Sequence, residues 1–199
     1  MIKNNFDKGP EGWCSYDYHA SMVADGSNIF ILATWAAQGG VDNGSCIWTD
    51  HRRWSADTPE RPLSILPLLC YRSWVGADPL DMRQSAVAVH LRADRLRLDG
   101  AQCFFWVHAA STRWHYTAHP LALAEGVWTA NRLALAADEN QWHRSWSADP
   151  DHPVALEQVL SRAESYGFSF VGFSSEVTGK LSMSQFSILN TENDCLDIL

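Results

Sequence analysis

Ser85-Ala-Val-Ala-Val-His-Leu-Arg92 decides the fold, because apolar and polar side chains alternate along it. Successive side chains of a β-strand point to opposite faces of the sheet. One face of this segment carries Val87, Val89 and Leu91. The other face carries Ala88, His90 and Arg92. The alternation therefore predicts a strand with one face in an apolar core and one face that presents polar groups.

The next segment, Gln102–His108, repeats this pattern after a turn signal at Asp99-Gly100. Its apolar face carries Cys103, Phe105 and Val107, and its other face carries Phe104, Trp106 and His108. A polar break at 109–112 then leads into Arg113–Thr117. We expect these last two runs to form a hairpin.

Further strands are predicted at 28–35, 168–173 and 181–188, each next to a turn signal. Apolar residues at helical spacing predict one short surface helix near 153–165, with Asp151 as its N-cap. Strands separated by turns, with a single helix, favour an all-β antiparallel β-sandwich over βαβ units. One domain over residues 1–188, followed by a tail at 189–199, fits this pattern.

Composition sets the class of protein. The 199 residues are 46% hydrophobic and 19% charged, so the chain can bury a core. A formal net charge of -8 repels phosphate backbones and anionic lipid, so we expect neither nucleic acid nor a membrane as partner. Ten tryptophans are several times ordinary usage, which suggests that some of them face a ligand.

The N-terminal residues lack the apolar run of a secretory signal, and no stretch is long and apolar enough to span a membrane. The five cysteines are odd in number and form no Cys-x-x-Cys pair. These features predict reduced, unpaired thiols in a cytoplasmic protein.

Three segments resemble a known architecture. Phe6-Asp-Lys-Gly-Pro-Glu-Gly-Trp13 is similar to the opening of galactose-binding-like jelly rolls. Gly39–Asp50, with Trp54 and Asp57-Thr-Pro59 behind it, resembles a Gly-rich loop and strand of laminin IV-like modules. The closing runs 168–173 and 179–188 resemble the final paired strands of carbohydrate-binding modules of the same class.

The resemblance covers nearly the whole chain, from Phe6 to Ile188, and implies a jelly-roll β-sandwich. In that fold one face of a sheet packs the core and the other can form a concave platform. The resemblance also implies a possible structural calcium ion near the first and last strands, with Asp7 at the matching place.

The non-core face of the two alternating segments is the first candidate site. It would bring together His90, Arg92, Trp106 and His108, and Tyr116 would join them in one hairpin register. Two histidines, an arginine and a tryptophan on an outward sheet face fit a ligand cleft. The alternative is a second buried face, in which each polar group would need a partner.

A second candidate lies between two indoles, in Trp48-Thr-Asp-His-Arg-Arg-Trp54. Trp48 would stack on a sugar ring while Asp50 and Arg52 form hydrogen bonds with its hydroxyl groups. Asp50 and His51 would also suit general acid–base catalysis. The alternative is a loop whose charges pair with each other. Asp17, close to His19, is a further candidate carboxylate.

These features predict a protein that binds a carbohydrate or a similar polyhydroxylated ligand, either a glycan or a small molecule. The alternative is an enzyme on the same scaffold, a glycoside-active hydrolase or lyase or a natural-product cyclase or isomerase. Its candidate catalytic residues are Asp50, His51, Asp17 and His108. A third hypothesis is an assembly protein with a Trp-rich docking face. The sequence leaves the oligomeric state open.

Overall fold

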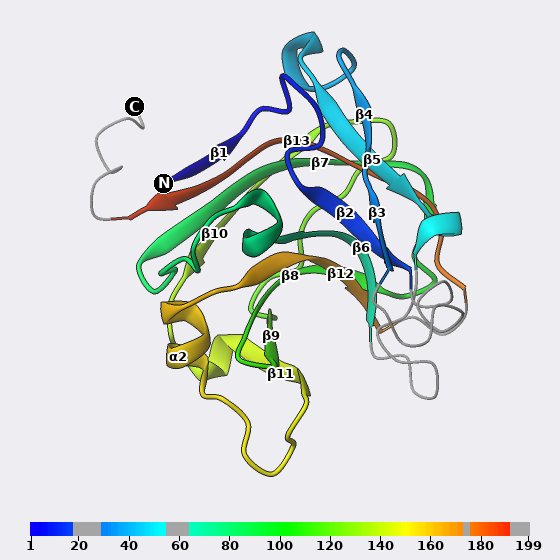
Figure 1. Cartoon of the computed structure of the whole chain (residues 1–199). Helices are drawn as coiled ribbons and strands as arrows, with labels where there is room; N and C mark the ends of the chain where they lie inside the picture. The colour runs from blue at the N-terminus through cyan, green and yellow to red at the C-terminus, as the bar shows by residue number, and fades with distance from the viewer. Residues whose placement is uncertain (18–28, 55–63, 173–175, 192–199) are drawn as a thin grey trace.

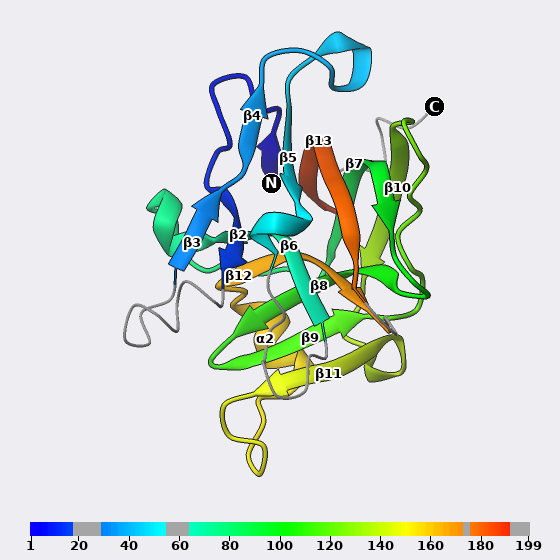
Figure 2. The same cartoon turned by 90° about the vertical axis from the view of Figure 1, so that its right-hand side faces the viewer.

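The computed structural model describes residues 1–17, 29–54, 64–172 and 176–191. Two antiparallel sheets pack face to face and form a β-sandwich, seen as two layers in Figures 1 and 2. The all-β sandwich expected from the alternating segments is confirmed.

The first sheet, here called sheet A, has the strand order β10-β7-β13-β5-β4, with β1 beside β13. Its strands are β1 (Ile2–Asn4), β4 (Thr34–Ala36), β5 (Cys46–Asp50), β7 (Ser85–Arg97), β10 (Thr129–Leu135) and β13 (Thr178–Asn190). The long strand β13 pairs with β7 along one side and with both β5 and β1 along the other.

The second sheet, sheet B, has the order β11-β9-β8-β12-β6-β2-β3. Its strands are β2 (Trp13–Asp17), β3 (Ile29–Leu32), β6 (Ser64–Tyr71), β8 (Gln102–Ala109), β9 (Thr112–Tyr116), β11 (Trp142–Ser147) and β12 (Ser165–Val171). The expected hairpin is confirmed, because β8 pairs with β9. The expected strand 28–35 is divided between the two sheets, since β3 lies in sheet B and β4 in sheet A.

Four single-turn 3-10 helices connect strands: η1 (Val41–Asn43), η2 (His51–Arg53), η3 (Arg72–Val75) and η4 (Glu139–Gln141). The α-helix α2 spans Leu156–Ser161, which is shorter than the expected 153–165. Ala155, not Asp151, is its N-cap, and no side chain caps it. Leu156, Val159 and Leu160 are buried where α2 packs on β8 and β9 (Figure 1), while Glu157 and Gln158 are exposed, so the expected surface helix with one apolar face is confirmed.

The core between the sheets is aromatic. Trp13 of β2 stacks on Phe168 and meets Phe186 edge-on, at centroid distances of 5.8 and 4.8 Å. Tyr166 stacks on Phe186 at 5.7 Å, so both sheets contribute to the cluster. The apolar faces expected for the two alternating segments are confirmed, because their six apolar residues are all at most 2% exposed.

Cys14, Cys46, Cys70 and Cys103 are buried and unpaired, as expected, and Cys195 lies outside the described residues. Burial raises the pKa of Cys70 to about 11. No helix in the described part of the chain is long and apolar enough to cross a membrane. The strand β13 continues to Asn190, two residues beyond the expected end of the domain.

Candidate functional site

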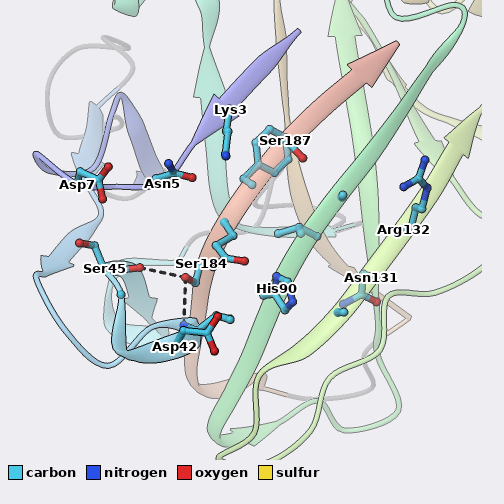
Figure 3. Close-up of a pocket in the computed structure, with 17 residues that line it drawn as sticks. Lys3, Asn5, Asp7, Asp42, Ser45, His90, Asn131, Arg132, Ser184 and Ser187 are labelled. Atoms are coloured by element: carbon cyan, nitrogen blue, oxygen red, sulfur yellow. Dashed lines mark hydrogen bonds between the residues drawn. The ribbon is translucent and has the colours of Figure 1, made fainter. Parts of the chain in front are cut away.

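The outer face of sheet A holds a groove of about 700 Å³ (Figure 3). Its floor is formed by β7, β13 and β10, and its walls by β1 and the loop around η1. Lys3 of β1 and Arg132 of β10 lie on opposite sides of it, and neither side chain has an ion pair or hydrogen bond within the described residues. Asp7 and Asp42 line the same groove near the loop.

A β-bulge in β13 shapes the floor. The register with β7 shifts between Ser184 and Ser187, where two residues of β13 oppose one of β7. Gln185 takes φ of 52° there and is exposed, while Phe186 turns into the core. The bulge therefore turns Ser184, Gln185 and Ser187 towards the groove without removing Phe186 from the aromatic core.

His90 lies at the centre of the floor, between Ser184 of β13 and Ala130 of β10. Its Nδ1 is buried and has no hydrogen-bond partner among the residues that the structure describes. A buried polar atom without a partner costs about 1–3 kcal/mol. The unmet hydrogen bond of His90 therefore marks a position where a ligand group or a water molecule would be stabilised.

One hydrogen bond closes the loop 39–45, which forms a wall of the groove, and another ties this loop to β13. Gly40 N–H donates to the Gly44 carbonyl at 2.8 Å, and Ser184 Oγ donates to the Ser45 carbonyl at 3.0 Å. A Cβ on Gly40 would lie 2.4 Å from the Ser45 oxygen and 2.8 Å from Ser184 Oγ. The loop can approach the strand this closely because residue 40 has no side chain.

Below the groove on the same face, Asp94 of β7 gathers three donors. Lys180 Nζ lies 3.2 Å from its carboxylate, Arg92 Nε 3.2 Å and Ser182 Oγ 3.1 Å. Arg92 also reaches the Gly39 carbonyl at 3.2 Å, which ties the ion cluster to the loop wall of the groove.

Beyond this cluster, Trp48 and Asp50 face a second pocket of about 680 Å³. Arg52 binds the Asp50 carboxylate through Nη2 at 2.6 Å and lowers the pKa of Asp50 by that hydrogen bond and by its charge. His51 Nδ1 lies 3.2 Å from the Gly179 backbone nitrogen. Asp50 is thus a charge-paired carboxylate held at the end of β5.

The structure brings five predicted site residues to one face. His90, Arg92, Trp48, Asp50 and Arg52 come from two separate candidate clusters, yet all lie on or beside the outer face of sheet A. They meet because β13 lies between β5 and β7 and joins the two segments in one sheet.

The predicted cleft that combined His90 and Arg92 with Trp106 and His108 is wrong. The assignment of inward and outward side chains within each strand is right. However, β7 lies in sheet A and β8 in sheet B, so their outer faces point away from each other. Trp106 is 2% exposed, and its Nε1 donates to the Phe168 carbonyl at 3.1 Å. It packs with Cys14, Leu66 and Leu69 in a second apolar cluster.

The other predicted residues lie elsewhere. Tyr116 belongs to the main core, 4% exposed, and meets Trp142 edge-on at 5.2 Å. Asp17 ends β2, and its side chain lies outside the described part of the chain. Asp7 is exposed at the groove, but no three His, Cys, Asp or Glu side chains converge on a metal position within the described residues. The calcium ion therefore stays a prediction.

Sequence reasoning missed several groove residues: Lys3, Asn131, Arg132, Ser184 and Gln185. Arg132 carried a usable signal, because it alternates with Leu133 and Leu135 and so had to point outward. Gln185 carried no such signal, because the alternation of apolar and polar residues does not reveal where a β-bulge reverses one side chain.

The fold has counterparts among solved structures. The family 11 carbohydrate-binding module from Clostridium thermocellum, in complex with a β-1,3-1,4-mixed-linked tetrasaccharide, matches with a TM-score of 0.50 at 8% identity. The match covers 94% of this chain and 93% of that module. This chain therefore shares the β-sandwich fold of that module.

Two further structures are similar. The N-terminal CBM22-1–GH10 modules of the Clostridium thermocellum xylanase 10B, complexed with xylohexaose, match at 10% identity and a TM-score of 0.49. This chain is covered completely but spans 30% of that one. A solution structure of CtCBM11 matches at 8% identity and a TM-score of 0.48, over 96% of this chain and 94% of that one. None of the three is described as a laminin IV-like module, so that resemblance stays a prediction.

Neither a protein-family model nor a curated protein matches the sequence.

Trp106→Ala tests the corrected placement of this indole. We expect a loss of about 3–5 kcal/mol in the free energy of unfolding, because a buried side chain is removed from the second apolar cluster. Chemical denaturation measures it, with the half-exposed Trp146→Ala as control. If the variant kept its stability but lost saccharide binding, the buried placement would be wrong and Trp106 would lie on a face that contacts ligand.

The imidazoles of sheet B predict a pH dependence of stability. Burial, with Arg113 close by, lowers the pKa of His108 to about 4 and that of His115 well below its usual value. The unfolded chain therefore binds more protons below pH ~6.5, and the free energy of unfolding falls as pH drops from there towards 4. His108 alone contributes on the order of 3 kcal/mol.

Denaturation at pH 7 and pH 4.5 measures this dependence. His108→Gln should reduce the pH dependence and leave the part that comes from His115, whereas the exposed His119→Gln should keep the dependence of the parent protein. An equal dependence in all three proteins would contradict the assignment.

Gly40→Ala tests the loop wall of the groove. The new Cβ overlaps the Ser45 carbonyl, so we expect a loss of about 1–3 kcal/mol in stability and a displaced loop. Gly44→Ala is the matched control, because its Cβ would meet one backbone oxygen at 3.0 Å. Thermal unfolding of both variants compares their losses of stability. A smaller loss in Gly40→Ala than in Gly44→Ala would contradict the position of the loop.

Proposed function

We propose that the outer face of sheet A binds a carbohydrate. The observation that carries this proposal is the groove of about 700 Å³ on this face, with the half-buried imidazole of His90 on its floor and a buried Nδ1 that has no partner among the described residues. A saccharide hydroxyl both donates and accepts hydrogen bonds, so it can satisfy either tautomer of the imidazole.

The other groups of the groove suit the same ligand. Gln185 and Asn5 are amides and Ser187 carries a hydroxyl, so the floor and one wall offer both hydrogen-bond donors and acceptors. Lys3 and Arg132 add charged donors from opposite sides. A polyhydroxylated chain lying across the strands would find partners for several of its rings. The fold supports this proposal, because a structure with the same fold holds a tetrasaccharide.

The enzyme hypothesis draws less support from the described residues. A general acid for glycoside cleavage needs a carboxyl group that keeps its proton near neutral pH. Asp50 has the opposite tendency, because Arg52 lowers its pKa. His108 lies in sheet B, away from the groove, and Asp94 is bound by two cations. Binding without catalysis is therefore the function that this geometry favours.

His90→Ala tests the proposal. The probe is a panel of neutral and acidic oligosaccharides of matched length, measured by isothermal titration calorimetry. Loss of one hydrogen bond worth about 0.5–1.5 kcal/mol should weaken binding by roughly two- to tenfold. Gln185→Ala should act in the same direction.

The exposed His143→Ala, on β11 of sheet B, is the control for a changed histidine and should bind as the parent protein does. An equal loss in His143→Ala, or no binding of any saccharide by the parent protein, would contradict the proposed function.

A further inference from the structure

The second pocket on the outer face of sheet A, here called the Trp48 pocket, is the strongest unexplained feature of the molecule. Its volume of about 680 Å³ is lined by Trp48, Asp50, Arg52, Asp94, Arg95 and Lys180. Lys180 and Ser184 are four residues apart on β13, so the pocket lies roughly 13 Å along the sheet from the floor of the groove. A single extended ligand can reach both.

The lining is positively charged in an acidic protein. Its three basic side chains face two carboxylates, whereas the whole chain has 23 acidic and 15 basic residues. Both carboxylates are already engaged, Asp50 by Arg52 and Asp94 by Lys180 and Arg92. The Arg95 side chain has no partner among the described residues and is exposed. An unused positive charge therefore faces the pocket.

Arg95 is held in a strained backbone conformation. Its φ is 52°, a region that costs a residue with a side chain about 1–2 kcal/mol. Its N–H donates to Glu125 Oε1 at 2.7 Å, which fixes the turn. Gly179 passes so closely that a Cβ there would lie 2.4 Å from the Arg95 carbonyl oxygen. Strain that neighbours maintain in this way is concentrated at functional sites.

The indoles of this face are already covered by cations. Lys180 Nζ lies 5.1 Å and Arg53 Cζ 5.8 Å from the Trp48 ring centroid. Arg92 Cζ lies 4.6 Å above the ring of Trp128. A neutral sugar that stacked on these rings would have to displace a cation from each face that it used. An anion would instead accept hydrogen bonds from the same cations without moving them.

We propose that the Trp48 pocket binds the anionic group, a carboxylate or a sulfate, of an acidic saccharide whose chain continues into the groove. This proposal rests on the proposed function, because the rest of the saccharide occupies the His90 floor. Arg95 and Lys180 are the residues that select the charged sugar, and Glu125 and Gly179 are positioning residues for Arg95.

The test compares three probes of equal length: a polygalacturonate oligosaccharide, a sulfated galactan oligosaccharide and a neutral mixed-linked β-glucan oligosaccharide. We expect the parent protein to bind at least one acidic probe about tenfold more tightly than the neutral one, and less tightly as salt rises. Arg95→Gln and Lys180→Gln should each remove most of that advantage and leave the affinity for the neutral probe within about twofold.

Arg144→Gln, on the exposed face of β11, removes the same charge from sheet B and should change nothing. Thermal unfolding of every variant confirms that each one is folded, and Arg95→Gln remains informative if Lys180→Gln unfolds. The preferred acidic probe tells a carboxylate from a sulfate.

Equal affinity for neutral and acidic probes, or an equal loss in Arg144→Gln, overturns this inference and leaves the proposed function standing. Binding of no probe at all overturns both.

Discussion

The pairing of β13 with β7 is the interaction on which the rest of the structure depends. It runs from Thr178 to Asn190 and turns Val87, Val89 and Leu91 inward, so it builds the core and the outer face of sheet A at once. The other edge of β13 accepts both β5 and β1, which brings the Trp48 segment and the N-terminal strand onto the same face. A slip of one residue in this register would exchange core and groove.

Two irregularities in that ladder shape the outer face of sheet A. The bulge at Gln185 keeps Phe186 in the aromatic core while polar side chains of β13 face the groove. The shift in strand register beside Gly179 directs Arg95 towards the Trp48 pocket. Both place a residue with a side chain at positive φ, a conformation that regular pairing avoids.

Alternation in the sequence correctly predicted the inward and outward residues of β7 and β8, the hairpin that follows, and the β-sandwich. It could not say in which sheet each strand lies, and that determines which outward residues meet. His90 and Trp106 each point outward as predicted, yet from opposite layers. The pairing of β13 with β5 and β7 is a long-range contact with no local signal, so the sequence could not reveal that Trp48 and Arg92 share a face. Lys3 was missed for the same reason, and Gln185 because the sequence does not reveal a β-bulge.

The central claim is that ligand binds the outer face of sheet A. Backbone amide chemical shifts, followed by NMR while an oligosaccharide is titrated, test it most directly, because every strand reports its own position. The account predicts that the largest changes fall on Ser184–Ser187, His90, Arg132 and the loop 39–45, while β8, β9 and β11 stay unchanged. Changes concentrated around Trp106 and His108 would contradict it and place the ligand on sheet B.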